Sequence, residues 1–180
     1  MDAHSHIGLD GYGEPGVDIN ERNDICCPQL RAIDGVNPMD ESFVYARSAG
    51  ITCVCTGPGS ANVLGGTFTA IKTAGTRIDD MIVKKEAAMK CAFGENPKRC
   101  YASKCDSSRM TTAAILREAL MKARLYLQKK EAAGDDVFRQ PAFDMKLEAL
   151  IPVLRGQIPL KAHAHRADDI FTAIRIAYEF

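Results

Sequence analysis

Short apolar segments alternate with amphipathic ones along this chain, and the alternation limits the folds open to it. Residues 51–57 and 158–165 are short and apolar, as buried strands are. Residues 108–134 instead repeat apolar side chains every three or four positions, which predicts a helix closed by Gly134. Further strands are expected within 1–9 and ending near Gly94, and further helices over 37–50, 142–156 and 166–180. Strands separated by helices favour an α/β fold with a parallel sheet, because a parallel connection needs a dozen or more residues.

Glycine and proline mark the expected connections. Residues 10–24 are rich in Gly, Pro and Asp and predict an extended loop, and residues 58–71 are interpreted as a glycine-rich turn. Pro38 is expected in the first turn of the helix over 37–50. Pro152 and Gly156 are expected to end the helix over 142–156.

Composition excludes several classes of partner. The 180 residues, 46% of them hydrophobic, are enough for a single domain over 1–180. Because 23 basic residues balance 23 acidic ones, the charge favours neither nucleic acid nor an anionic membrane. The chain shows no basic segment followed by an apolar run and no stretch of roughly 20 apolar residues, so a cytoplasmic protein is expected. The seven cysteines, an odd number without C-x-x-C spacing, are expected to be reduced thiols.

All four histidines fall into two His-x-His pairs, His4 with His6 and His163 with His165. Residues two apart in a strand project from the same face, so each pair is expected to direct its two rings together. Both pairs stand near the carboxyl end of an expected strand, where the sites of α/β folds gather. The pairs therefore predict a functional site at that end of the sheet.

The chemistry of such a site is metal binding. Imidazole is a common ligand of zinc and similar divalent ions, and several imidazoles with a carboxylate hold the ion while leaving a position for water. The alternative is that each histidine is an ordinary polar residue near a strand end. That explanation suits one isolated histidine better than two spaced pairs, so a site for Zn²⁺ or another divalent ion is predicted.

The segments that carry the histidines resemble the amidohydrolase superfamily. "MDAHSHIGL" is similar to the end of its first barrel strand, where members carry His-x-His after an aspartate such as Asp2. "AHAHRADDIFTAI", "GPGSANVLGG" and "FGENPKR" resemble its imidazolonepropionase-like and prolidase-like branch. The resemblance implies a partial TIM-like (β/α) barrel, made of strands one to five with their helices, and His4, His6 and His163 as metal ligands. It also implies that His165 contacts substrate or supports the ligands.

For the fourth ligand, the resemblance leaves two candidates. Family members use either a glutamate after the third strand or a carboxylated lysine that bridges two metals, and Glu95 and Lys90 are the residues in reach. If Met89, Cys91 and Phe93 fill the barrel interior, Glu95 shares their face and Lys90 does not. Glu95 is therefore favoured, and Lys90 remains the alternative.

The glycine-rich turn is expected to line the site, with Ser60 and Asn62 as contacts to a small-molecule substrate. The resemblance implies a metal-dependent hydrolase of carbon–nitrogen bonds, in a dipeptide, another amide or a cyclic amide. It leaves the general base unassigned, and the fold does not select the substrate.

Complete family members carry further site residues on later strands, a histidine on the sixth and an aspartate on the eighth. This sequence has no strand for them, so we expect a fragment of the full enzyme that is inactive alone. The alternative is a non-catalytic remnant or assembly module. Its open barrel edge would be covered by the remainder of the chain or by a second copy in a homo-oligomer.

Overall fold

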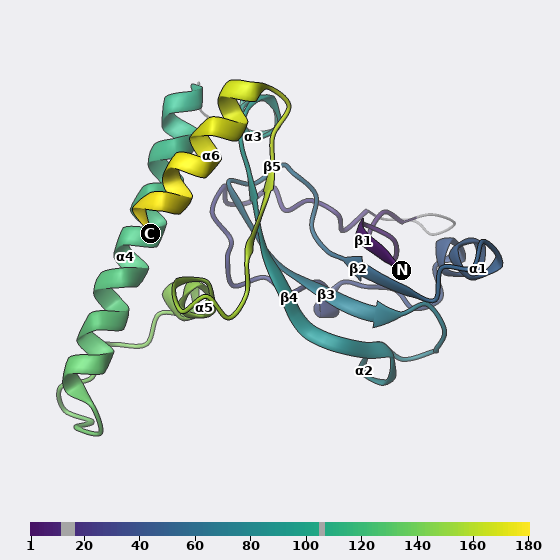
Figure 1. The fold of residues 1–180 in the computed structure, drawn as a ribbon, viewed down its shortest axis with the longest axis horizontal. Helices are drawn as coiled ribbons and strands as arrows, with labels where there is room; N and C mark the ends of the chain where they lie inside the picture. Colours follow the sequence, from purple (N-terminus) through teal and green to yellow (C-terminus); the bar gives the residue numbers. More distant parts are fainter. Residues whose placement is uncertain (12–16, 105–106) are drawn as a thin grey trace.

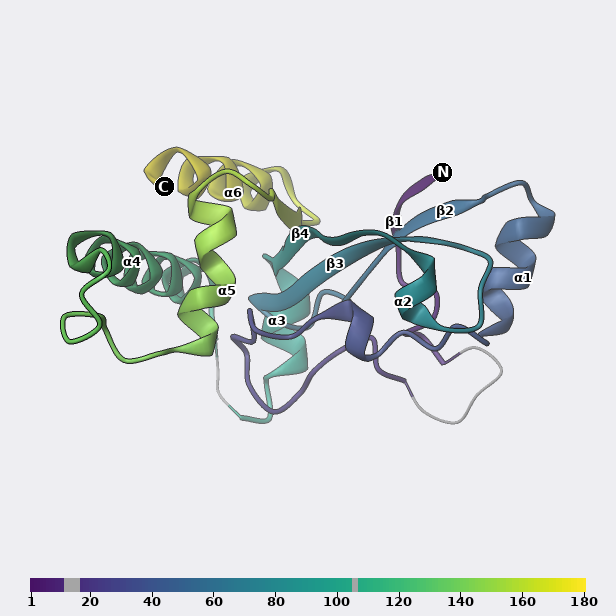
Figure 2. The same cartoon turned by 90° about the horizontal axis from the view of Figure 1, so that it is seen from below.

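A five-stranded sheet curls into half a barrel, and its helices lie mainly on one side (Figures 1 and 2). The computed structural model describes residues 1–11, 17–104 and 107–180. Across the sheet the strands follow chain order: β1 (Asp2–Ser5), β2 (Cys53–Thr56), β3 (Leu64–Lys72), β4 (Ile82–Ala92) and β5 (Leu160–His163). The helices are α1 (Glu41–Ser48), α2 (Ile78–Met81), α3 (Glu95–Cys100), α4 (Arg109–Ala133), α5 (Met145–Leu154) and α6 (Ala167–Glu179), with a 3₁₀ turn, η1, at Ala32–Asp34.

Four of the five strands run in the same direction. β1 is parallel to β2 and β4 is parallel to β5, whereas β3 is antiparallel to both of its neighbours. The α/β prediction is confirmed, but the expectation of an all-parallel sheet is wrong. The connections from β2 to β3 and from β3 to β4 are too short for the crossover that a parallel pair needs, so each of them reverses the chain. The carboxyl ends of β1, β2, β4 and β5 consequently meet at one end of the sheet.

Strand β3 corrects the prediction of a turn over 58–71. Its second half is rich in β-branched and aromatic residues, which favour a strand, and the glycines that suggested a turn lie instead at a shift in register against β4. Gly66 has a φ of 104°, and a Cβ there would lie 2.4 Å from the carbonyl oxygen of Leu30. Glycine therefore lets β3 pass close to residues 26–31, which form bridges to Leu64 and Thr67.

The long predicted helices are confirmed. α4 begins after Ser108, whose hydroxyl accepts a hydrogen bond from the Thr111 N–H (3.3 Å), and Gly134 follows its last residue. α6 occupies nearly all of the segment predicted for it. Figures 1 and 2 show α4, α5 and α6 grouped on one side of the sheet.

Two prolines take other positions than expected. α1 begins at Glu41, after the N-cap Asp40, so Pro38 precedes the helix. Pro152 lies inside the last turns of α5 and does not end it. The short helix α3 was not predicted; it begins directly after Gly94, near which the preceding strand was expected to end.

The two faces of the sheet have different surroundings. The face toward the helices carries the main core. In it, Met89 and Cys91 of β4 and Phe93, just after β4, pack with helical residues: Leu116, Leu120, Leu150 and Ile176. The concave face carries a smaller cluster of Cys55, Phe68 and Ala88. The concave face is therefore only partly filled by apolar side chains, and it is where the polar site lies.

Two further expectations concern the membrane and the thiols. Within the described ranges, no helix combines the length and the apolar character that crossing a bilayer requires. The cysteines of the described part are free thiols, as predicted: Cys26, Cys27, Cys53, Cys55, Cys91 and Cys100. Cys105 lies outside the described residues.

Candidate functional site

The two histidine pairs lie at the carboxyl ends of β1 and β5, and the rings within each pair are in contact. The ring centroids of His4 and His6 are 5.1 Å apart, with the planes at 90°. Those of His163 and His165 are 4.5 Å apart, with the planes at 88°. The prediction that each pair directs its rings to one side is confirmed, although His6 and His165 stand just beyond the strand ends.

The curl of the sheet brings its two edges together at this point. β1 and β5 are the outermost strands in the strand order, yet the Lys161 ammonium group of β5 donates a hydrogen bond to the Ala3 carbonyl oxygen of β1 (2.6 Å). The same nitrogen lies 4.4 Å from the ring centroid of Phe68 in β3. The two histidine pairs, which begin on opposite edges, therefore face the same concave space.

Phe68 forms the floor of this space. Its side chain is fully buried, and its ring centroid is 5.1 Å from that of His4 and 6.0 Å from that of His6. The Lys90 ammonium nitrogen lies 5.6 Å from the same ring. We call the histidine site the four side chains around this ring, His4, His6, Lys90 and Lys161, together with His163, which interacts with Lys90 and His6.

Partial desolvation and nearby positive charge favour the neutral form of two imidazoles, the exposed His4 and the half-buried His163. Desolvation, followed by the charges of Lys90, Lys161 and His6, lowers the pKa of His4 to about 4. The pKa of His163 is also lowered, first by burial and then by Lys90 and other positive neighbours that include His6. Neutral imidazole is the form that coordinates metal ions.

Two hydrogen bonds orient the histidines. His6 Nδ1 lies 2.6 Å from the Gly57 carbonyl oxygen, which can only accept, so Nδ1 carries the proton and Nε2 keeps a free lone pair. The Asn96 amide nitrogen lies 3.1 Å from His163 Nε2 and donates to it. His163 can therefore offer Nε2 to a metal only when the Asn96 side chain turns away.

Position 57 must be glycine because there is no room for a side chain between its backbone and the Phe68 ring. A Cβ at position 57 would lie 2.4 Å from Cγ of Phe68, a distance that real side chains do not show. Glycine thus allows the loop after β2 to cross the Phe68 ring while its carbonyl holds His6.

We expect Gly57→Ala to lower the free energy of unfolding by about 1–3 kcal/mol, because an overpacked core must shift a ring or the backbone. Urea unfolding followed by circular dichroism measures the change. Gly65→Ala is the matched control, since its Cβ would make an ordinary 3.5 Å contact with Lys90 Cγ. Equal effects of the two substitutions would contradict the role assigned to Gly57.

The structure places Glu95 away from the histidines. It is the first residue of α3, half its side chain is exposed, and its carboxylate lies 2.6 Å from Arg109 and 3.7 Å from Lys98. Arg109 also binds the buried carboxylate of Asp169 at 2.9 Å, so this ion-pair group joins the starts of α3, α4 and α6. These arginine and lysine contacts lower the pKa of Glu95.

Glu95 was favoured over Lys90 on the premise that Met89, Cys91 and Phe93 fill the barrel interior, and that premise is wrong. Met89, Cys91 and Phe93 pack against the helices, so they lie on the outer face of β4 and not in the barrel interior. Lys90, between them, points to the concave face, where it is 1% exposed and makes its cation–π contact with Phe68. Burial lowers the pKa of Lys90 to about 8, and the charge of Lys161 adds to the effect.

The remaining predicted residues take different positions. His165 is exposed beside His163. Asn62 is buried, and its amide donates to the Asp24 carbonyl oxygen (2.8 Å) and to the Tyr101 hydroxyl (2.9 Å). Ser60 is half-buried in the same connection. Contact of Asn62 and Ser60 with substrate stays a prediction, and the amide of Asn62 already has protein partners.

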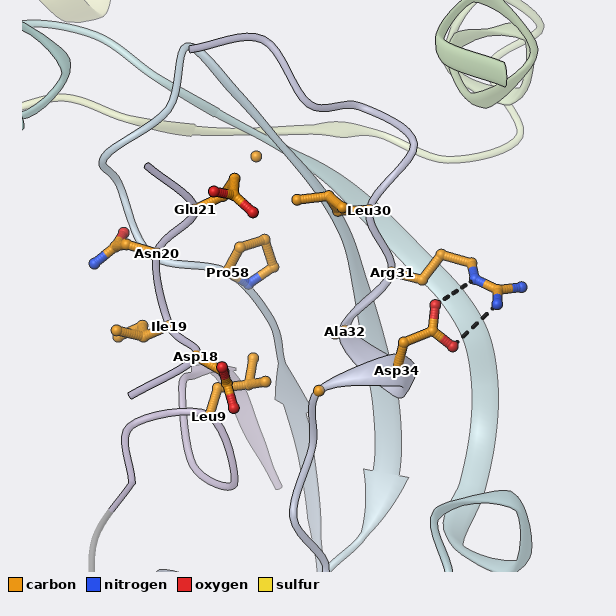
Figure 3. A pocket seen from close by; sticks show the side chains of 12 residues that line it. Leu9, Asp18, Ile19, Asn20, Glu21, Leu30, Arg31, Ala32, Asp34 and Pro58 are labelled. Atoms are coloured by element: carbon orange, nitrogen blue, oxygen red, sulfur yellow. Dashed lines mark hydrogen bonds and ion pairs between the residues drawn. The ribbon is translucent and has the colours of Figure 1, made fainter. Parts of the chain in front are cut away.

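A cavity of about 310 Å³ borders the loop that follows Gly57, and none of its lining residues belongs to the histidine site. Segment 18–21 lines one side and segment 30–35 the other, with Pro58 between them (Figure 3). Pro58 follows Gly57, the partner of His6, and Gly65 of the cavity wall borders Lys90. We call it the Pro58 cavity; its acidic groups include Asp18 and Glu21.

Sequence reasoning missed four contributors, Lys161, Phe68, Gly57 and Asn96. Lys161 lies two residues before His163, so its place on the same strand face was available from the spacing. The other three come from strands or loops whose neighbours only the folded chain brings together. In the described part of the chain, no group of three or more His, Cys, Asp or Glu side chains is arranged to hold a metal ion.

Comparison with known proteins identifies the family. No protein-family model matches the chain. It is 31% identical over 205 residues to the amidohydrolase tasK of Hapsidospora irregularis, an alignment that covers 100% of this chain and 21% of that protein. It is 45% identical to the crystal structure of an amidohydrolase from Thermotoga maritima MSB8, with a TM-score of 0.93 over 99% of this chain and 48% of the other. The chain thus spans less than half the length of either relative.

Fold and site together define a half-barrel of the α/β class with histidine pairs at the carboxyl ends of its edge strands. The two relatives carry the assignment further. The chain belongs to the amidohydrolase superfamily, as the resemblance of its histidine segments predicted.

Proposed function

We propose that this chain supplies the metal-binding half of a hydrolase that cleaves a carbon–nitrogen bond in an amide or cyclic amide. The observation that carries the proposal is the meeting of β1 and β5 across Phe68, where Lys161 joins the two edges and both histidine pairs face one space. The names of the two relatives support hydrolase chemistry at the level of the family.

The donor atoms are of the kind that a divalent ion such as Zn²⁺ binds, although within the described residues no three of the side chains are already grouped around one point, so the side chains would move to bind it. His4 and His6 stand side by side, and the lowered pKa of His4 favours its neutral, coordinating form. His6 presents a free Nε2 because its Nδ1 donates to the Gly57 carbonyl oxygen. His163 is the third proposed ligand, from the opposite edge of the sheet. A bond from a ligating imidazole to a backbone carbonyl is the usual way in which proteins orient such ligands.

For the fourth ligand, the geometry favours Lys90 over Glu95. Lys90 is a buried amine without a hydrogen bond or ion pair to another described residue, whereas the Glu95 carboxylate is held by Arg109. A buried unpaired amine is costly, so a functional use explains its retention. Carboxylation of Lys90 would turn it into an oxygen ligand.

The protein residues would divide the work as follows. When bound, the metal ion would lower the pKa of its water and polarise the substrate carbonyl. Gly57 orients His6, Asn96 would release His163 Nε2 by turning away, and Phe68 closes the floor of the site to water. The Pro58 cavity is the proposed place for the rest of the substrate, and its acidic rim suits a positively charged group.

Metal retention tests the proposal directly. The purified chain is loaded with zinc, desalted and analysed for metal by mass spectrometry, and then assayed with zinc, manganese and cobalt against dipeptides, N-acyl amino acids and cyclic amides. We expect bound metal with turnover near background, because the site has no assigned general base to take a proton from the attacking water. A chain that retains no metal would overturn the proposal and favour a non-catalytic assembly module.

Lys90→Met separates the two candidate ligands. We expect zinc retention to fall well below that of Glu95→Gln, measured by competition with a chromophoric chelator. The same variant should raise the free energy of unfolding of the metal-free protein by about 1–3 kcal/mol, because it removes a buried unpaired amine. Stronger loss of zinc in Glu95→Gln would restore Glu95 as the ligand.

A further inference from the structure

A second cavity lies between α5 and residues 28–34, on the other face of the sheet. Its volume is about 490 Å³, and its floor includes Thr67 of β3 and Glu86 of β4. Thr67 precedes Phe68, and successive residues of a strand project to opposite faces, so this cavity is separate from the histidine site. We call it the α5 cavity.

The α5 cavity contains two buried polar atoms without partners. The Thr67 side chain is 4% exposed, and its hydroxyl makes no hydrogen bond to the described residues. The side-chain carbonyl oxygen of Gln29, which also lines the cavity, is likewise buried and without a partner. A buried polar atom left unpaired costs about 1–3 kcal/mol, so both atoms favour a ligand that supplies the missing hydrogen bonds.

The charges at the cavity favour a cation. Glu86 is half-buried and forms no ion pair within the described residues. Glu148 of α5 is held through Oε1 by the Tyr126 hydroxyl (2.7 Å) and by Lys130, which leaves its Oε2 outside those bonds. Arg31, a positive side chain of the lining, is bound to Asp34 by hydrogen bonds of 2.8 and 3.0 Å (Figure 3). The charge of Arg31 also interacts with Glu86, but no ion pair joins these two side chains.

We propose that the α5 cavity binds a small organic cation of the guanidinium type. Gln29, Thr67 and the two glutamates present several acceptors, and a guanidinium group carries several N–H donors in one plane. The apolar part of the lining, from Pro28, Met145 and Pro152, suits a short alkyl chain attached to that group. The proposal does not depend on hydrolysis or on a metal at the histidine site.

Calorimetric titration of the purified chain with propylguanidinium tests the site. We expect saturable binding that weakens about tenfold in Thr67→Val and about tenfold in Glu86→Gln, because each variant removes one bond to a charged ligand. Glu41→Gln, an exposed position at the start of α1, is the matched control and should bind as the unsubstituted chain does. Propylurea, the neutral analogue, should bind at least about tenfold more weakly.

Three outcomes would overturn the proposal: no binding of propylguanidinium, equal binding of propylurea, or unchanged affinity in both Thr67→Val and Glu86→Gln. Circular dichroism of each variant identifies a loss of folding, and the two positions lie on different strands, so one misfolded variant leaves the other decisive. Binding that persists in His4→Ala/His6→Ala shows that the α5 cavity acts independently of the proposed metal.

Discussion

Replacing both His4 and His6 with alanine is expected to abolish zinc retention by the purified chain. The two imidazoles lie side by side, and His6 is oriented for coordination by the Gly57 carbonyl oxygen. Loss of a residue that only orients a ligand lowers metal affinity about 10–100-fold, so loss of two ligands should exceed about 100-fold. Competition with a chromophoric chelator measures the affinity, and mass spectrometry measures the bound metal.

His165→Ala is the matched control for this experiment. His165 touches the ring of His163 but is exposed, and we assign it no coordination of the metal. Zinc affinity should therefore change much less than in the double variant. Equal zinc binding by the unsubstituted chain and by His4→Ala/His6→Ala would rule out the histidine site as the metal site.

Phe68→Ala is expected to lower the free energy of unfolding by about 3–5 kcal/mol, the usual cost of removing a buried aromatic side chain. Phe68 is fully buried, and its ring contacts His4 and His6 on one side of the curl and Lys161 on the other. The cavity left behind would also loosen the two histidines, so zinc affinity should fall together with stability. Urea unfolding and chelator competition measure the two effects.

Phe171→Ala provides the comparison, because this α6 side chain is 63% exposed. Its truncation should change stability by no more than about 0.5 kcal/mol. A Phe68→Ala protein as stable as the Phe171→Ala protein would show that the concave face is not packed around Phe68. Retained zinc affinity in an otherwise destabilised Phe68→Ala would mean that the ring stabilises the fold without positioning the histidines.

The sequence alone predicted the features that arise from residues close together in the chain, namely the long helix and the histidine pairs. The helical repeat of residues 108–134 predicted α4, and the two-residue spacing of each histidine pair predicted that its rings lie together. Both features arise from backbone geometry within a few residues, which one segment carries by itself. The histidine segments also carried the resemblance to the amidohydrolase superfamily.

Only the tertiary structure showed which face of each strand the helices cover and which residues therefore face the site. Alternation along the strand ending near Gly94 predicted that Lys90 and Glu95 lie on opposite faces, but the sequence could not tell which face the helices cover, and the assumed face was the wrong one. Glu95 in fact lies beyond β4, at the start of α3. β3 was missed for a related reason, since pairing with β2 and β4 stabilises a strand that its glycines disfavour. The contact of Lys161 with Ala3 joins residues 158 positions apart and exists only because the sheet curls. Spacing along the chain determined the pairs of histidines, and the long-range packing of the sheet decided which residues surround them.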